Sequence, residues 1–291
     1  MIKDTIKSRW DKLLDKGFIH YHPKQNSKLE LAEGKFPLRI DYVPERAKRL
    51  VTGKKSTTPL GTDLIGREDC LYVFDELVLL ANNRPIDRYH SILCSKDYLP
   101  QNEFSNREIK EVSQIVENTG MRSFLNMIGA AATLNHFHTQ VLFDKLNVEE
   151  LDKVYITENI GFLPDYPGGN ILITGNLNKR SELLWHMVEA LSMSSLPRTI
   201  RNDGSISEQH VYTLIFWDNY ILMIPRKKET PSFTGAMAGG LELSGYFLIT
   251  QPMTVNSTFE GVNYHKMLST IQEVTFSKQD IDFLYPEHSH S

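Results

Sequence analysis

The residues in this chain best placed for chemistry are His136, His138 and Gln140, which are spaced two apart. Successive side chains of a β-strand point to opposite faces, so on a strand these three share one face. A neutral imidazole is a competent nucleophile near pH 7, and a glutamine amide can donate a hydrogen bond to a phosphate oxygen. This spacing therefore favours a compact polar site on one edge of a sheet.

Two other interpretations of the histidine pair are an ordinary surface or core location and a zinc site, because neutral imidazole is a common zinc ligand. A zinc site needs a third and usually a fourth ligand. The two cysteines, Cys70 and Cys94, are far apart, and the chain has neither a CxxC nor an HExxH motif. The sequence assembles no metal site, so we expect neither a catalytic metal nor another cofactor.

The segment before the histidines is small and rich in hydrogen-bonding groups, from Asn126 through Gly129 and Thr133 to Asn135. Glycine and alanine allow backbone N–H groups to approach a ligand closely, as in phosphate-binding loops. We therefore expect Gly129 and Thr133 to contact phosphate. The side chains of Asn126 and Asn135 could bind phosphate oxygens, or they could fix the loop through Asx turns.

These residues together resemble the nucleophile strand of the histidine-triad superfamily. The run Gly129-Ala-Ala-Ala-Thr133-Leu-Asn135-His136-Phe-His138-Thr-Gln140, with Asn126 before it, matches the branch that has His-x-His-x-Gln. That branch contains galactose-1-phosphate uridylyltransferase, diadenosine tetraphosphate phosphorylase and the GDP-hexose phosphorylases, and the last of these fit best. Shorter segments resemble the same family in the same order, among them 82–93 and Tyr98-Leu99-Pro100-Gln101. Tyr89 departs from the family, which has glycine there.

The resemblance implies a mechanism for the three residues. His138 would attack the α-phosphorus of a nucleotide substrate and form a nucleotidyl-histidine, while His136 would orient the strand or the leaving oxygens. Gln140 can hold a phosphate oxygen but cannot deliver a proton, which suits a phosphate leaving group and a phosphate acceptor. The implied activity is phosphorolysis of a nucleotide-sugar of the GDP-hexose type. The alternatives are a dinucleoside polyphosphate phosphorylase or hydrolase, and a nucleotide-binding protein without turnover.

Accessory residues for the substrate come from two further segments. The first contains Asn83, in the expected turn over 82–88, and His90 and Lys96, on the strand that should neighbour the histidine strand; for Lys96 the commoner alternative is a solvated lysine. The second contains Glu242 and Ser244, which share a face if 241–249 is a strand. The resemblance makes that face a candidate for sugar or guanine contacts, although Glu242 could equally be an exposed edge charge.

Composition excludes several classes of protein. The 291 residues carry a net charge of −4, so a nucleic-acid backbone is not an expected partner. The chain has no apolar stretch long enough to span a bilayer and no secretion signal at its start. Two separated cysteines fit a reducing compartment, so we expect a cytoplasmic protein.

The pattern of the chain predicts an α+β fold with flanking helices, in two halves, 1–150 and 151–291. The resemblance implies a histidine-triad-like antiparallel sheet, and the second half could be a repeat of the first. The second half would lack catalytic histidines and could supply substrate contacts. Polar residues predict a loop over 48–62, and apolar periodicity predicts the remaining elements. The expected helices are 2–16, a capped helix between Ser105 and Gly120, and 181–191; the expected strands are 70–81, 90–95, the histidine strand, 170–174, 210–216, 220–224 and 241–249.

Overall fold

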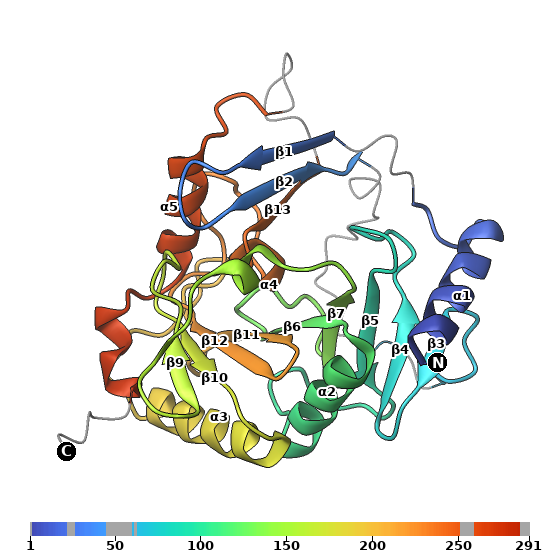
Figure 1. Ribbon diagram of the computed structural model, residues 1–291, viewed down its shortest axis with the longest axis horizontal. Coiled ribbons are helices and arrows are strands. Elements are labelled where there is room, and N and C mark those ends of the chain that lie inside the picture. Colours follow the sequence, from blue (N-terminus) through green and yellow to red (C-terminus); the bar gives the residue numbers. More distant parts are fainter. Residues whose placement is uncertain (1, 22–26, 45–59, 61–62, 251–258, 286–291) are drawn as a thin grey trace.

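A computed structural model describes residues 2–21, 27–44, 60, 63–250 and 259–285 (Figure 1). Over these residues the strands form a large antiparallel sheet of ten strands and a small sheet of three. The predicted α+β class is confirmed. Apart from Leu60, the predicted loop over 48–62 lies outside the described residues.

The large sheet has the strand order β3-β4-β5-β7-β6-β11-β12-β10-β9-β8, and every neighbouring pair in it is antiparallel. Its strands are β3 (Cys70–Val73), β4 (Leu77–Ala81), β5 (Ser91–Ser95), β6 (Arg122–Asn126), β7 (His138–Leu142), β8 (Val154–Tyr155), β9 (Ile160–Phe162), β10 (Ile171–Ile173), β11 (Tyr212–Trp217) and β12 (Tyr220–Pro225).

The large sheet is built from one strand arrangement used twice. In the first five strands a helix, α2 (Asn106–Thr119), connects β5 to β6, and β7 returns between them. In the second five a helix, α3 (Leu177–Ser192), connects β10 to β11, and β12 returns between them. The two sets meet where β6 pairs with β11. The boundary between 150 and 151 stays a prediction, since one sheet and its cores run through both halves.

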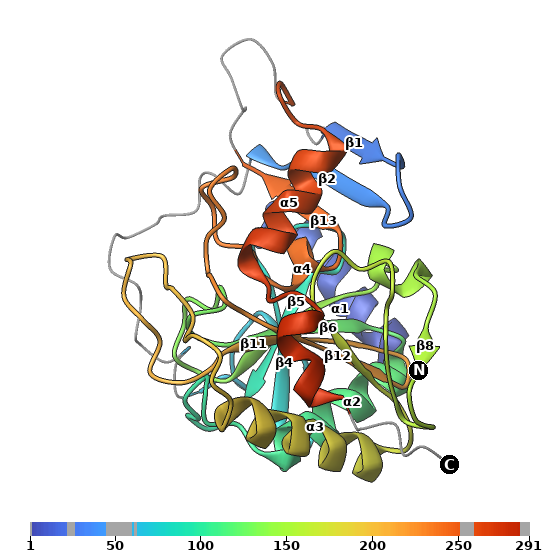
Figure 2. The ribbon, with the colours of Figure 1, turned by 90° about the vertical axis from the view of Figure 1, so that its left-hand side faces the viewer.

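Helices cover one face of the large sheet. Helices α1 (Ile2–Asp15), α2 and α3 lie along this face. In Figures 1 and 2, α2 and α3 are at the bottom of the molecule. Their apolar stripes pack on alternate strand residues in one buried cluster, which includes Trp10, Val112 and Leu184 together with Leu93 and Leu214. Each helix buries only one side, as the helical spacing of its apolar residues predicted.

The opposite face of the large sheet packs against the second buried cluster, and the Gln140 side chain of β7 lies on this face. Cross-strand partners share a face, and Gln140 pairs with Phe124, which pairs in turn with Ile215. Phe124 and Ile215 belong to a cluster covered by the small sheet, α4 (Gly240–Leu243) and α5 (Tyr264–Val274). The small sheet has the order β1-β2-β13, from β1 (Ser27–Leu31), β2 (Leu38–Tyr42) and β13 (Tyr246–Ile249). It stands above this face in Figure 1, and short helices complete the fold at Asn147–Glu150 and Gln279–Leu284.

Helix α2 shows how closely local sequence sets an element. The Ser105 N–H donates to Glu108 Oε2 at 2.7 Å, and Ser105 Oγ accepts the Arg107 N–H at 3.2 Å. This reciprocal capping satisfies N–H groups that the first turn leaves unpaired. The helix ends at Gly120, whose φ of 67° belongs to the left-handed region that favours glycine. The predicted bounds of this helix are confirmed.

Two predicted strands are corrected. The segment 70–81 is a hairpin of β3 and β4 rather than one strand, because Glu111 Oε1 accepts the N–H groups of Glu76 and Leu77 and holds a turn there. The segment 241–249 is not one strand either, since its first part is helix α4. Gly240 lets this helix lie against β6: a Cβ on Gly240 would come within 2.8 Å of Phe124 Cβ.

Candidate active site

His138 opens β7, and its ring orientation is fixed by the backbone before it. Nδ1 lies 2.7 Å from the carbonyl oxygen of His136, and because a carbonyl can only accept, Nδ1 carries the proton and donates. In the neutral ring the lone pair is then on Nε2. The imidazole is half-buried at the start of the strand. The local chain therefore selects the tautomer whose lone pair is on Nε2.

His136 has a structural role, which is to hold the backbone that orients the His138 ring. It lies just before β7 rather than within it, which shortens the predicted strand, and its side chain is completely buried. Nε2 lies 2.9 Å from the Ser95 carbonyl, and Nδ1 accepts the Leu60 N–H at 3.1 Å. Both ring nitrogens are thus engaged by backbone. His136 holds in place the peptide whose carbonyl orients His138.

The buried ring of His136 predicts a pH dependence of stability. Burial lowers its pKa below the ordinary value of about 6.5, so the unfolded chain binds a proton there more readily than the folded chain. The stabilising contribution is complete above about pH 6.5 and is lost as pH falls below it, towards the folded pKa. We expect His136→Gln to flatten the fall in unfolding free energy between about pH 6.5 and 5, measured by urea denaturation. An unchanged slope would contradict the assignment.

Gln140 is oriented by His90, which lies directly before β5. His90 Nδ1 accepts the Ile86 N–H at 3.1 Å, so in the neutral ring Nε2 carries the proton. That Nε2 lies 3.2 Å from Gln140 Oε1 and donates to it. The carbonyl end of the Gln140 amide is therefore held by His90, and the NH₂ end is the part of this group that can donate to a phosphate oxygen.

Removal of the His90 donor should weaken this orientation without removing Gln140. We expect His90→Phe to lower turnover by about tenfold, because one positioning hydrogen bond of about 1.4 kcal/mol is lost from the reactive arrangement. His20→Phe, at an exposed histidine, is the matched control and should keep normal turnover. Equal losses in the two variants would show that His90 does not position the site.

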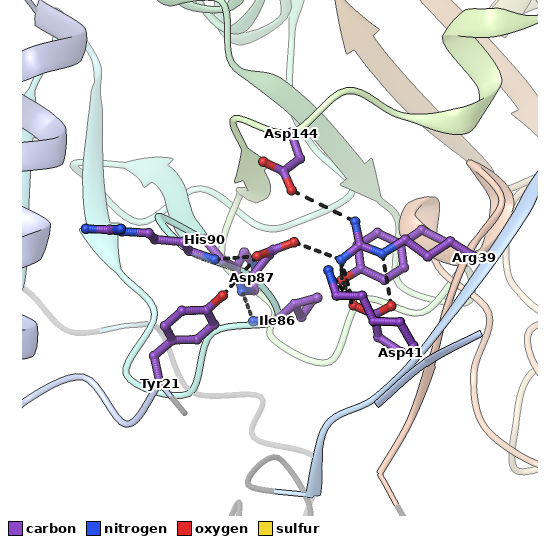
Figure 3. Close-up of polar contacts among 10 residues, drawn as sticks. Tyr21, Arg39, Asp41, Ile86, Asp87, His90 and Asp144 are labelled. Atoms are coloured by element: carbon purple, nitrogen blue, oxygen red, sulfur yellow. Dashed lines mark hydrogen bonds and ion pairs between the residues drawn. The ribbon is translucent and has the colours of Figure 1, made fainter. Parts of the chain in front are cut away.

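Figure 3 shows how the turn that carries His90 is anchored to the small sheet. Arg39 Nη2 donates to Asp87 Oδ2 at 3.0 Å and to Asp41 Oδ2 at 2.6 Å, and the His90 N–H donates to the Asp87 carbonyl at 3.2 Å. Burial opposes ionisation of Asp87, but hydrogen bonds from Asp144, the Arg88 N–H and Arg39 hold its pKa below the ordinary value. This charged pair joins the turn to β2.

Gln101 is a positioning residue that the sequence interpretation did not single out. Its side chain is fully buried at the ends of β6 and β7. Nε2 donates to the Asn126 carbonyl at 2.6 Å and the His138 carbonyl at 3.0 Å, while Oε1 accepts the His138 N–H at 2.8 Å. Gln101 thus extends the hydrogen bonding between the two strands. The resemblance of the Leu99-Pro100-Gln101 segment was the signal that could have found it.

The predicted phosphate-binding loop is corrected in part. The N–H groups of Ala130 and Ala132 donate to the Met127 carbonyl, and the Ala131 N–H donates to Glu229 Oε1 at 3.2 Å. These donors are occupied within the protein and do not form a phosphate cradle in this conformation. Gly129 has a φ of 95° and is buried in the turn, so its conformational freedom shapes the loop.

Asn126 links the site to helix α4. Its Oδ1 accepts the Gly240 N–H at 2.9 Å and the Thr213 hydroxyl at 3.2 Å, so only its NH₂ end could contact a substrate. Behind it, the fully buried Arg226 donates from Nη1 to Thr213 Oγ1 at 3.1 Å. Burial lowers the pKa of Arg226 to about 10, so the guanidinium stays charged at neutral pH.

Four predicted accessory residues lie elsewhere or are used internally. Asn83 is exposed, and its carbonyl accepts the His20 N–H. Lys96 Nζ donates to the Asp75 carbonyl at 2.6 Å rather than to a group on β7. Glu242 accepts the Gly239 N–H at 2.9 Å, and the buried Ser244 hydroxyl donates to the Leu241 carbonyl at 2.7 Å. Because this segment is helical, Glu242 and Ser244 do not form the predicted strand face.

Thr133 and Asn135 line an open cavity of about 400 Å³ beside the loop that leads to β7. Asn135 Oδ1 also accepts the Gln101 N–H at 3.1 Å, which places this residue between the cavity and the histidine strand. Among the described residues, no group of three or more His, Cys, Asp or Glu side chains could hold a metal ion. No helix in the described part of the chain is long and apolar enough to cross a bilayer.

Solved structures share the fold of this chain. Three crystal structures of yeast Ap4A phosphorylase Apa2 are similar over nearly the whole chain. The form in complex with Ap4A has a TM-score of 0.68 at 12% identity, covering 94% of this chain and 97% of that one. A further crystal structure of the same yeast enzyme gives 0.67 at 13% (95% and 97%), and the AMP complex gives 0.66 at 12% (95% and 96%). No protein-family description and no curated protein matches the sequence. The predicted resemblance is confirmed at the level of the fold.

Proposed function

We propose that this protein is a nucleotidyltransferase that cleaves a nucleotide-sugar of the GDP-hexose type with inorganic phosphate. The nucleotidyl group would be carried on His138 between the two steps. The observation that carries the proposal is the hydrogen bond from His138 Nδ1 to the His136 carbonyl, which leaves the lone pair of the neutral ring on Nε2. A ring held in this way loses little rotational freedom on reaction, and preorganisation of the nucleophile lowers the barrier.

The proposed reaction has two displacements at the same phosphorus. Nε2 attacks the α-phosphorus and forms an N–P bond while the bond to the bridging oxygen breaks, and hexose 1-phosphate leaves with the bonding electrons. Inorganic phosphate then attacks the nucleotidyl-histidine and regenerates the imidazole. Both the leaving and the entering groups are phosphates, so neither step needs a proton donor. The Gln140 NH₂ group, oriented through His90, would hold an equatorial oxygen in both steps.

The preferred donor is a nucleotide-sugar of the GDP-hexose type, as the sequence around the histidine strand implies. The second candidate donor is a dinucleoside polyphosphate, and the fold shared with yeast Ap4A phosphorylase supports it. The two candidates predict different products. With phosphate, GDP-hexose would give GDP and hexose 1-phosphate, whereas Ap4A would give ADP and ATP. Incubation of the purified protein with each labelled donor, with and without phosphate, followed by chromatography, separates them.

The nature of Gln140 predicts the acceptor. An amide cannot activate water, so the adduct should persist until phosphate arrives, and release of nucleoside monophosphate should be slow. We expect Gln140→His to increase the share of hydrolysis while lowering total transfer, because a third imidazole could act as a general base. The measurement is the ratio of GMP to GDP at saturating phosphate. A native protein that forms mainly GMP under these conditions is a hydrolase.

A further inference from the structure

A second cavity lies behind the open one, on the helix-covered face of the large sheet. Its volume is about 150 Å³, and it adjoins the open cavity at Asn102 and Gln209, which line both. The walls are aromatic and aliphatic, with Trp185 from α3, Tyr212 from β11 and Phe104 from the segment before α2. A cavity of similar size with apolar walls can accommodate a benzene ring.

Two of the side chains that line this inner cavity, His210 and Trp185, carry polar atoms that have no hydrogen-bond partner within the part of the chain that the structure describes. They are the two ring nitrogens of His210 and Nε1 of Trp185, and all three atoms are buried. His210 is only 6% exposed. A buried polar atom without a hydrogen bond destabilises the folded protein, so its presence calls for an explanation such as a bound ligand.

The chemistry of these atoms defines what would satisfy them. Burial, together with the nearby positive charge of Arg198, lowers the pKa of His210 against the opposing effect of the Ser194 backbone, so at neutral pH the ring is neutral and offers one donor and one acceptor. Trp185 offers a second donor. A flat ring with both acceptors and donors on its edge meets these requirements between aromatic walls, whereas a hydrocarbon ring would leave all three atoms unsatisfied.

The open cavity supplies a place for a polar group attached to such a ring. Arg201 lines it and has a buried Nε without a partner among the described residues. Glu103 and Glu208 also line it, and their carboxylates can accept hydrogen bonds from sugar hydroxyls. We propose that the two adjoining cavities form a nucleoside-binding site, distinct from the catalytic imidazole, with the base in the inner cavity and the sugar in the outer one.

The inference does not depend on turnover at His138, so binding alone tests it. The probes are adenosine and guanosine, titrated into the full chain while tryptophan fluorescence is followed at a wavelength that nucleosides do not absorb. Trp10 and Trp217 are 0% and 2% exposed and lie outside the cavity lining, so the change should come from Trp185 and vanish in Trp185→Phe. Absence of saturable binding by either nucleoside at millimolar concentration would overturn the proposal.

Two substitutions in the cavity and one outside it locate the site. His210→Phe keeps the ring plane but removes both nitrogens, and Val188→Phe fills the inner cavity without changing its polar atoms. Equilibrium dialysis should show at least about tenfold weaker nucleoside binding in each. His186→Phe, the same change at an exposed position of α3, should bind normally. His210→Phe should also melt no lower than the native protein, since it removes two unsatisfied atoms. Unchanged binding in both cavity variants would place the nucleoside elsewhere.

Discussion

Replacing His138 with alanine is expected to abolish nearly all turnover, a fall of several powers of ten, because loss of a covalent nucleophile typically has an effect of that size. The proposed role follows from the geometry of the ring, whose Nδ1 donates to the His136 carbonyl and whose Nε2 carries the lone pair of the neutral form. Initial rates with GDP-hexose and with Ap4A measure the effect. The native protein, denatured during turnover, should also carry a nucleotidyl group that is acid-labile and base-stable.

The matched control for this variant is His186→Ala, since His186 is exposed on α3. It should retain native activity and should still form the adduct. The covalent mechanism would be wrong if His138→Ala kept full activity with a donor that the native protein uses. Loss of activity without any adduct in the native protein would instead indicate direct transfer between the substrates.

The second large effect is expected from Gln101→Met, which keeps the length of the side chain but removes all its hydrogen bonds. The change leaves the His138 N–H and the Asn126 carbonyl, both bonded by Gln101 in the native protein, without these partners. We expect a loss of about 2–4 kcal/mol in unfolding free energy. Turnover should fall as well, because the start of β7 is no longer fixed.

Urea denaturation and initial rates measure the two effects of Gln101→Met separately. Gln114→Met is the control, because Gln114 is exposed on α2 and the same substitution there should change stability by less than about 0.5 kcal/mol. A Gln101 variant with native stability and native turnover would show that the strand ends are held by their other contacts alone.

Local signals in the sequence were sufficient for much of the fold. The capping residues Ser105 and Glu108 predicted the start of α2, and alternation predicted that His138 and Gln140 share a face. These features depend on residues near in sequence, so a single chain reveals them. The resemblance of the histidine strand also predicted the architecture, which the likeness to yeast Ap4A phosphorylase confirms.

The errors concern features that depend on residues distant in sequence. The pattern of 241–249 predicted one strand, on which Glu242 and Ser244 would share a face, but Gly240 packs on Phe124 of β6 and the first part of the segment forms a helix. The small residues near Gly129 predicted a phosphate cradle, but the carboxylate of Glu229, almost a hundred residues later, occupies one of its donors. Gln101 acts through backbone groups of two strands, and no local pattern predicts such contacts; the resemblance of the Leu99-Pro100-Gln101 segment was the available signal.

The repeated strand arrangement has a consequence for how the chain holds together. Each set of five strands has one edge strand that pairs with the other set, β6 in the first and β11 in the second. Cutting the chain after residue 150 would therefore give two fragments, each with an uncovered hydrogen-bonding edge lined by apolar side chains. Such edges promote aggregation when they are exposed. If the two fragments are produced together, the same edges can pair again, so this protein is suited to fragment complementation. Recovery of transfer activity would report that β6 and β11 have paired again.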